Sequence, residues 1–149
     1  MYSRRKAKEV KIGNITIGGN HPIAVQSMLN TLASDADACV EQALKLEKAG
    51  CEIIRAAIPD EKALELIPAI KKEISVPIVA DIHFDYRLAI KSAELGIDKI
   101  RINPGNIGSQ ERVKAVADAC RQKNIPIRII RTYTYHAVEC PIFNIMLTQ

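Results

Sequence analysis

Polar residues interrupt two apolar segments at spacings that suit binding chemistry. In "VADIHFDYRLAI", Asp81 and His83 are two positions apart, and in "DKIRINPGNIG", Arg101 and Asn103 have the same spacing. Side chains alternate between the faces of a strand, so residues two apart share a face. We therefore predict that each pair projects from one side of a sheet, near the end of its strand.

Arginines stand at similar positions in two further apolar segments. Arg55 lies within "EIIRAA" and Arg128 within "IPIRII". A buried guanidinium needs a counter-charge, and Asp81 can neutralise only one of the three, counting Arg101. A diphosphate offers bidentate acceptors to the others. The alternative is that each arginine pairs with a local carboxylate at the rim of the fold.

Two neighbouring features could add to such a site. His83 follows Asp81 at the expected strand end, which makes it a candidate proton donor or phosphate contact, although a purely structural histidine is the alternative. The loop "NPGNIGS" leads into a helix at Ser109 and could offer free amides to a phosphate. These features add to the prediction of an anionic ligand.

One strand–helix unit repeats along the chain and must position these residues. Strands are predicted at 22–28, 51–57, 76–81, 97–103 and 125–130. Helices are predicted to begin near Asp35, Asp60, Asp85 and Ser109, and Pro68 should kink or split the second one. Before the first unit, "VKIGNITIGG" is typical of a hairpin turning at Gly13-Asn14.

Strands that alternate with single helices indicate an α/β fold with a parallel sheet. A doubly wound sheet and a (β/α)8 barrel both remain open, but the first strand-to-helix turn lacks a Gly-rich phosphate fingerprint. This favours the barrel. Five strands are too few to close one, so we predict an incomplete (β/α)8 TIM-type barrel with an N-terminal β-hairpin.

Composition narrows the class of protein. The 149 residues suffice for one domain, and 48% hydrophobic with 26% charged residues is typical of globular proteins. Only 4% are aromatic, which argues against a base-stacking nucleic-acid surface, and we expect no membrane span and a cytoplasmic location. We expect no metal site, because the cysteines lack ligand spacing and suit buried positions; they are Cys39, Cys51, Cys120 and Cys140.

Four segments together resemble a known family. They are "VQSMLNT" (25–31), "AGCEIIRAAIP" (49–59), "VADIHFDYRLA" (79–89) and "DKIRINPGNIG" (98–108). In this order and spacing they resemble the N-terminal barrel of the 4-hydroxy-3-methylbut-2-enyl diphosphate synthase family, which acts in non-mevalonate isoprenoid biosynthesis. The resemblance covers residues 5–129, and residues 1–129 are expected to form part of a substrate-binding barrel.

The resemblance implies an iron–sulfur oxidoreductase. The family opens the ring of 2-C-methyl-D-erythritol 2,4-cyclodiphosphate reductively and eliminates water, with electrons from flavodoxin or ferredoxin through a [4Fe-4S] cluster. It implies diphosphate contacts at Arg55, Arg101 and Arg128 and further pocket contacts at Asp81, His83 and Asn103. In the family the cluster lies in a separate C-terminal domain, which caps the partner's barrel in a homodimer.

The sequence departs from the family pattern after residue 129. A pocket Asn of the family is replaced by Thr132, and residues 130–149 show neither the remaining strands nor the cluster ligands. We expect that a frameshift or premature stop produced this segment and that this chain alone is inactive. The alternatives are an inactive remnant or structural half-barrel, and another phosphosugar-binding barrel such as an aldolase, for which no strand-end Lys supports a Schiff base.

Overall fold

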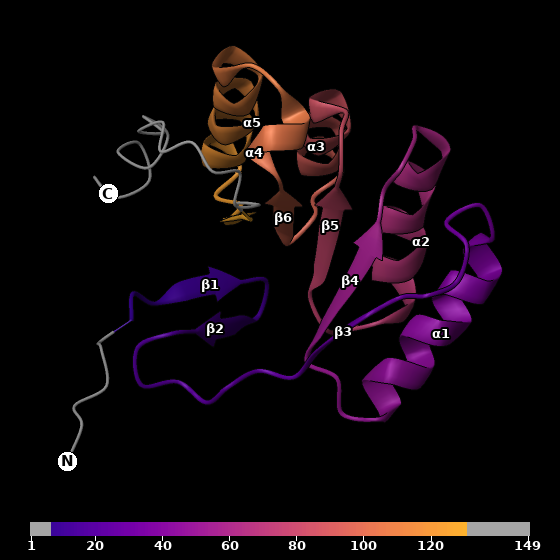
Figure 1. The fold of residues 1–149 in the computed structure, drawn as a ribbon. Coiled ribbons are helices and arrows are strands. Elements are labelled where there is room, and N and C mark those ends of the chain that lie inside the picture. The colour runs from indigo at the N-terminus through magenta and orange to yellow at the C-terminus, as the bar shows by residue number, and fades with distance from the viewer. Residues whose placement is uncertain (1–6, 131–149) are drawn as a thin grey trace.

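The computed structural model describes residues 7–130, which form a five-stranded parallel sheet and a separate two-stranded hairpin. The strands of the sheet lie side by side in chain order. They are β3 (Gln26–Met28), β4 (Ile53–Ala57), β5 (Ile78–Ile82), β6 (Lys99–Ile102) and β7 (Ile127–Ile129). All five predicted strands are present, each somewhat shorter than predicted, and their carboxyl ends lie at one edge of the sheet (Figure 1).

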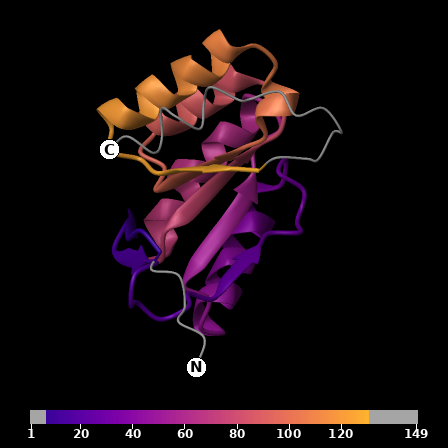
Figure 2. The same ribbon diagram turned by 60° about the vertical axis from the view of Figure 1, so that its left-hand side comes forward.

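Helices connect successive strands and lie together along one face of the sheet (Figures 1 and 2). They are α1 (Ala36–Lys48), α2 (Leu66–Glu73), α3 (Tyr86–Glu94) and α5 (Gln110–Gln122), with the short helices η1 (Lys62–Glu65) and α4 (Pro104–Ile107) before α2 and α5. The main core fills the space between these helices and the sheet, where residues such as Ile54, Ile100 and Val116 are fully buried. We call this the helix face and the opposite side the inner face.

Capping residues start the helices where the sequence predicted. Carboxylates of Asp35, Asp60 and Asp85 accept hydrogen bonds from backbone amides of the first turn. Ser109 occupies the corresponding position of α5, but its side chain makes no capping hydrogen bond. Pro68 splits the second helix as predicted, because the 3-10 turn η1 gives way to α2 just before it.

The hairpin covers the amino-terminal end of the inner face. Its strands are β1 (Val10–Ile12) and β2 (Ile15–Ile17), and they pair antiparallel around the predicted two-residue turn. Ile12 forms a small second core with Ile53 of β4 and Val79 of β5. At the turn, Gly13 has φ +54, and a Cβ there would lie 3.0 Å from Pro77 Cβ. The turn therefore fits only glycine comfortably at this close approach.

The sheet is open, as predicted for an incomplete barrel. Within residues 7–130, β3 and β7 form its two edges and do not pair with each other. In the same range, no helix is long and apolar enough to cross a membrane. The prediction about the origin of residues 130–149 lies outside the described residues except at Ile130.

Candidate functional site

Strand register brings four of the predicted site residues to the inner face. Asp81 on β5 pairs with Arg101 on β6, which pairs in turn with Arg128 on β7. Ala57 on β4 also pairs with Asp81, so Arg55, two residues earlier, shares that face. The three arginines and Asp81 therefore lie on the same side of the sheet, as a shared site would require.

Asp81 is the centre of a charged cluster. Only 1% of it is exposed. Arg101 donates from Nη1 to Oδ1 of Asp81 at 2.6 Å, and Nε of Arg55 lies 3.2 Å from Oδ2. His83 Nε2 lies 3.7 Å from the same Oδ2, with its side chain 43% exposed. One carboxylate thus faces two guanidinium groups and an accessible imidazole.

Hydrogen bonding inside this cluster is incomplete. Oδ2 of Asp81 and Nε of Arg101 are buried and have no hydrogen-bond partner within residues 7–130. Arg55 makes a close ion pair with Oδ2, but its N–H groups are directed to Sδ of Met28, at 3.2 Å from Nε and 2.8 Å from Nη2. A thioether is a weak acceptor and carries no charge. The cluster therefore has two guanidinium groups for one carboxylate, and some of their N–H donors have no charged acceptor.

Arg128 and Asn103 lie outside this cluster. Arg128 is exposed on the inner face, and no contact joins it to Asp81. Asn103 is buried at the end of β6, where Oδ1 accepts a hydrogen bond from Gly105 N at 3.1 Å and caps α4. The structure thus unites Arg55, Asp81, His83 and Arg101, and it places the other two predicted residues beside them.

The prediction of free amides in the loop "NPGNIGS" is wrong for four of its residues. The loop forms the short helix α4, whose amides have intramolecular acceptors. Gly105 N donates to the Asn103 side chain, Asn106 N and Ile107 N donate to Asn103 O, and Gly108 N donates to Pro104 O. Because Asn103 acts as a helix cap, these amides do not remain for a phosphate.

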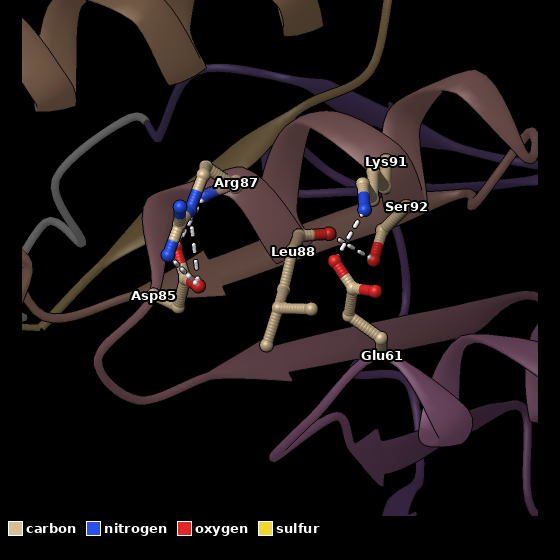
Figure 3. A network of polar contacts seen from close by, with 6 residues as sticks. All are labelled: Glu61, Asp85, Arg87, Leu88, Lys91 and Ser92. Carbon is tan, nitrogen blue, oxygen red and sulfur yellow. Dashed lines mark hydrogen bonds and ion pairs between the residues drawn. The ribbon is translucent and has the colours of Figure 1, made fainter.

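A polar network fixes helix α3, which begins at Tyr86, three residues beyond His83 (Figure 3). The Asp85 carboxylate binds both the backbone amide and the guanidinium of Arg87. On the next turns, Lys91 Nζ lies 2.5 Å from Oε1 of Glu61, and Ser92 Oγ donates to Leu88 O at 2.7 Å. The Arg87 guanidinium lowers the pKa of Asp85. These contacts hold the loop that presents His83.

Two inner-face residues were not predicted from the sequence. Met28 receives the Arg55 donors, and Lys99, at the start of β6, is only 8% exposed. Burial lowers the pKa of the Lys99 ammonium, and the nearby Arg128 guanidinium lowers it further. The signal for Lys99 was its spacing of two residues from Arg101, which places both on one face.

The described cysteines do not fit an iron–sulfur cluster. Cys39 Sγ contacts Thr31 Oγ1 at 3.0 Å, and Cys51 Sγ donates to Ile53 O at 3.0 Å. Cys120 is buried in the main core, and burial raises the pKa of its thiol to about 11. Within residues 7–130, no group of three His, Cys, Asp or Glu side chains is placed to hold a metal ion. Cys140 lies outside the described residues.

Comparison with known proteins identifies relatives over nearly the whole described range. Residues 7–131 match the family model of the GcpE TIM-barrel domain. The chain is 61% identical over 126 residues to 4-hydroxy-3-methylbut-2-en-1-yl diphosphate synthase (flavodoxin) of Caldanaerobacter subterraneus subsp. tengcongensis, covering 85% of this chain and 36% of that protein. The corresponding enzyme of Halalkalibacterium halodurans is 57% identical over 126 residues, 85% of this chain and 34% of its own length.

The chain therefore spans about a third of the length of the curated relatives it matches. Among solved structures, 7,8-dihydropteroate synthase from Vibrio fischeri ES114 matches with a TM-score of 0.66 and 17% identity, over 95% of this chain and 59% of that one. That likeness supports the fold alone. Together, the family model and the identity to two synthases show that the chain belongs to the GcpE TIM-barrel domain family.

Proposed function

We propose that residues 7–130 form the substrate-binding part of a cytoplasmic 4-hydroxy-3-methylbut-2-enyl diphosphate synthase, with 2-C-methyl-D-erythritol 2,4-cyclodiphosphate as ligand. The observation that supports this most is the excess of positive charge around Asp81 on the inner face. A doubly phosphorylated ring supplies the missing negative charge and acceptors. The names of the relatives give a diphosphate as the product, and the cyclodiphosphate substrate is what the family resemblance implies.

Each residue of the cluster has a proposed role. Arg55 and Arg101 bind the diphosphate oxygens, and Nε of Arg101, which has no acceptor among the described residues, donates to one of them. Asp81 holds both guanidinium groups in place. His83 is accessible enough to approach the ligand and donates a proton to a leaving oxygen.

The other two predicted residues complete the proposed pocket. Arg128 extends the positive face along β7, and Asn103 shapes the loop after β6 through its cap of α4. In the family, a [4Fe-4S] cluster supplies the two electrons for reductive ring opening, with flavodoxin or ferredoxin as donor. The residues at 7–130 bind and orient the ligand, and the donor, the cluster and a homodimeric assembly belong to the whole enzyme.

Isothermal titration calorimetry of the 149-residue chain with the cyclodiphosphate tests this proposal. We expect saturable binding that weakens with salt, and no binding of the unphosphorylated 2-C-methyl-D-erythritol. Arg101→Gln should lower affinity about ten- to a hundredfold, because a hydrogen bond to a charged group contributes about 1.5–3 kcal/mol.

Arg121→Gln is the matched control, since Arg121 lies on α5, pairs with Asp118 and is remote from the inner face. It should leave affinity unchanged. Equal binding heats for the cyclodiphosphate and for 2-C-methyl-D-erythritol would contradict the proposal. An equal loss of affinity in Arg101→Gln and Arg121→Gln would also contradict it.

A further inference from the structure

A glutamine of α1 binds the loop that joins β3 to α1. Gln42 lies in the second turn of α1 and is half-buried. Its Oε1 accepts hydrogen bonds from Asn30 N at 3.0 Å and from Thr31 N at 3.2 Å. Thr31 Oγ1 donates to the same oxygen at 3.1 Å, and Gln42 Nε2 donates to Asn30 Oδ1. We call these three residues the Gln42 clamp.

The strand before this loop is weakly attached to the sheet. β3 has three residues and, within residues 7–130, pairs with β4 alone, because it is an edge of the sheet. A short edge strand opens locally at a low cost in free energy, since few hydrogen bonds and packing contacts oppose the opening. Helix α1, by contrast, is anchored in the main core through Cys39 and Ala43. Hydrogen bonds from α1 therefore help to fix the residues that follow β3.

The segment next to the clamp holds Arg55 at two points. Leu29 N donates to Arg55 O at 2.9 Å, and Met28 Sδ receives Nε and Nη2 of the Arg55 guanidinium. A thioether is a weak acceptor, so this contact orients the guanidinium only while Met28 itself stays in place. A shift of residues 28–31 would therefore move Arg55 relative to Asp81, whose Oδ2 lies 3.2 Å from its Nε.

We propose that Gln42 is a positioning residue for Arg55: through Asn30 and Thr31 it fixes the segment that orients the Arg55 guanidinium on the inner face. This inference rests on the proposed function, because it gives Gln42 a part in binding the cyclodiphosphate. Helix α1 lies on the helix face, so Gln42 acts through the loop and not on the ligand. A binding group that is held in one orientation loses less entropy when the ligand binds, so loss of the clamp weakens affinity.

Nuclear magnetic resonance of the full chain in mildly acidic buffer tests the clamp without a ligand. The Arg55 Nε–H resonance is assigned by its loss in Arg55→Lys. We expect Gln42→Ala to shift or broaden this resonance and to speed hydrogen exchange of the Asn30 and Thr31 amides severalfold. Gln42→Glu keeps the acceptor oxygen and should restore both signals, since the Asn30 amide can turn and donate to the second oxygen. Gln122→Ala, exposed near the end of α5, is the matched control and should change neither.

Calorimetry with the cyclodiphosphate then tests the link to binding. Gln42→Ala should lower the affinity of the full chain about three- to tenfold, but should have no further effect when Arg55→Lys is already present. Combined with Arg128→Gln, it should keep its full effect. Equal losses in the Arg55→Lys and Arg128→Gln backgrounds would overturn the proposal, as would an Arg55 resonance that Gln42→Ala leaves unchanged.

The two measurements also separate this inference from the proposed function. A wild-type chain that does not bind the cyclodiphosphate would refute the proposed function. The Arg55 resonance would still decide whether Gln42 positions Arg55, because it is recorded without a ligand.

Discussion

Arg101 Nη1 donates a hydrogen bond to Asp81 Oδ1 at 2.6 Å, across the neighbouring strands β5 and β6. The two side chains are paired in register, and both lie largely out of solvent, at 16% and 1% exposure. Arg55 approaches the other oxygen of the same carboxylate from β4. Asp81 on β5 is therefore the shared counter-charge of two arginines, one on β4 and one on β6, and the stability of the inner face depends on it.

Asp81→Asn removes this charge and leaves two guanidinium groups on the inner face without a counter-ion. We expect the free energy of unfolding to fall by about 3–5 kcal/mol, since breaking one partner of a buried pair leaves an uncompensated charge. Urea denaturation followed by circular dichroism measures this. Added pyrophosphate should restore part of the loss, because it can replace the missing negative charge.

Asp118→Asn is the control for that experiment. Asp118 pairs with Arg121 on α5, away from the inner face, and both side chains are nearly half exposed to solvent. Its loss should change the free energy of unfolding by less than about 1 kcal/mol. Similar denaturation midpoints for the two variants would show that Asp81 has no special role in stability.

Met28 holds the Arg55 guanidinium without neutralising it. Met28→Leu keeps the volume and removes the sulfur that receives Nε and Nη2. We expect less than about 1.5 kcal/mol change in stability but severalfold weaker cyclodiphosphate binding, because Arg55 loses its orientation. Met28→Gln, which restores an acceptor, should recover binding. Calorimetry and urea denaturation on the same samples separate the two effects, and parallel losses in both would indicate a packing role only.

Hydrophobic periodicity and turn residues predicted the strands and helices correctly, because these signals depend only on residues close together in the sequence. Asp35, Asp60 and Asp85 each precede an amphipathic segment, and each caps a helix. The two-residue spacing of Asp81 and His83 was enough to place both beside one another, since strand alternation is a fixed geometric property. The order of the strands followed from the repeated strand–helix unit.

Side-chain contacts between neighbouring strands could not be predicted from these local signals. Whether Asp81 faces Arg101, Arg55 or Arg128 depends on register, which a single sequence does not specify. Asn103 has the type and spacing of a pocket residue, but its side chain is used locally as a cap, which competes for the same acceptor atom. Lys99 was overlooked because burial of one lysine in a mixed apolar segment depends on what covers it.

The residues that precede α3 and α5 allow a direct comparison of two helix caps. Asp85→Ala removes the acceptor of the Arg87 amide and should cost about 1 kcal/mol of stability, whereas Ser109→Ala, at a position without a capping bond, should cost only a few tenths. Thermal or urea denaturation of both variants checks this. Equal costs would mean that the Asp85 cap does not stabilise α3.

The Asp85 carboxylate should also make the free energy of unfolding depend on pH. The Arg87 guanidinium lowers the pKa of Asp85 in the folded chain, so its contribution is fully present above the unfolded pKa. It is lost as the pH falls through the lower folded value. The difference in stability between wild type and Asp85→Ala should therefore persist at neutral pH and shrink in strongly acidic solution.

Buried thiols should resist modification in the folded chain. Burial raises the pKa of Cys120 to about 11, so roughly one thiol in a thousand is ionised at pH 8, and only the thiolate reacts readily. We expect iodoacetamide to modify Cys39, Cys51 and Cys120 slowly in native buffer and rapidly in urea, as followed by peptide mass spectrometry. Rapid native modification of Cys120 would mean that the helix face opens around α5. Slow modification would instead show that this part of the core stays closed even though the sheet is open at both edges.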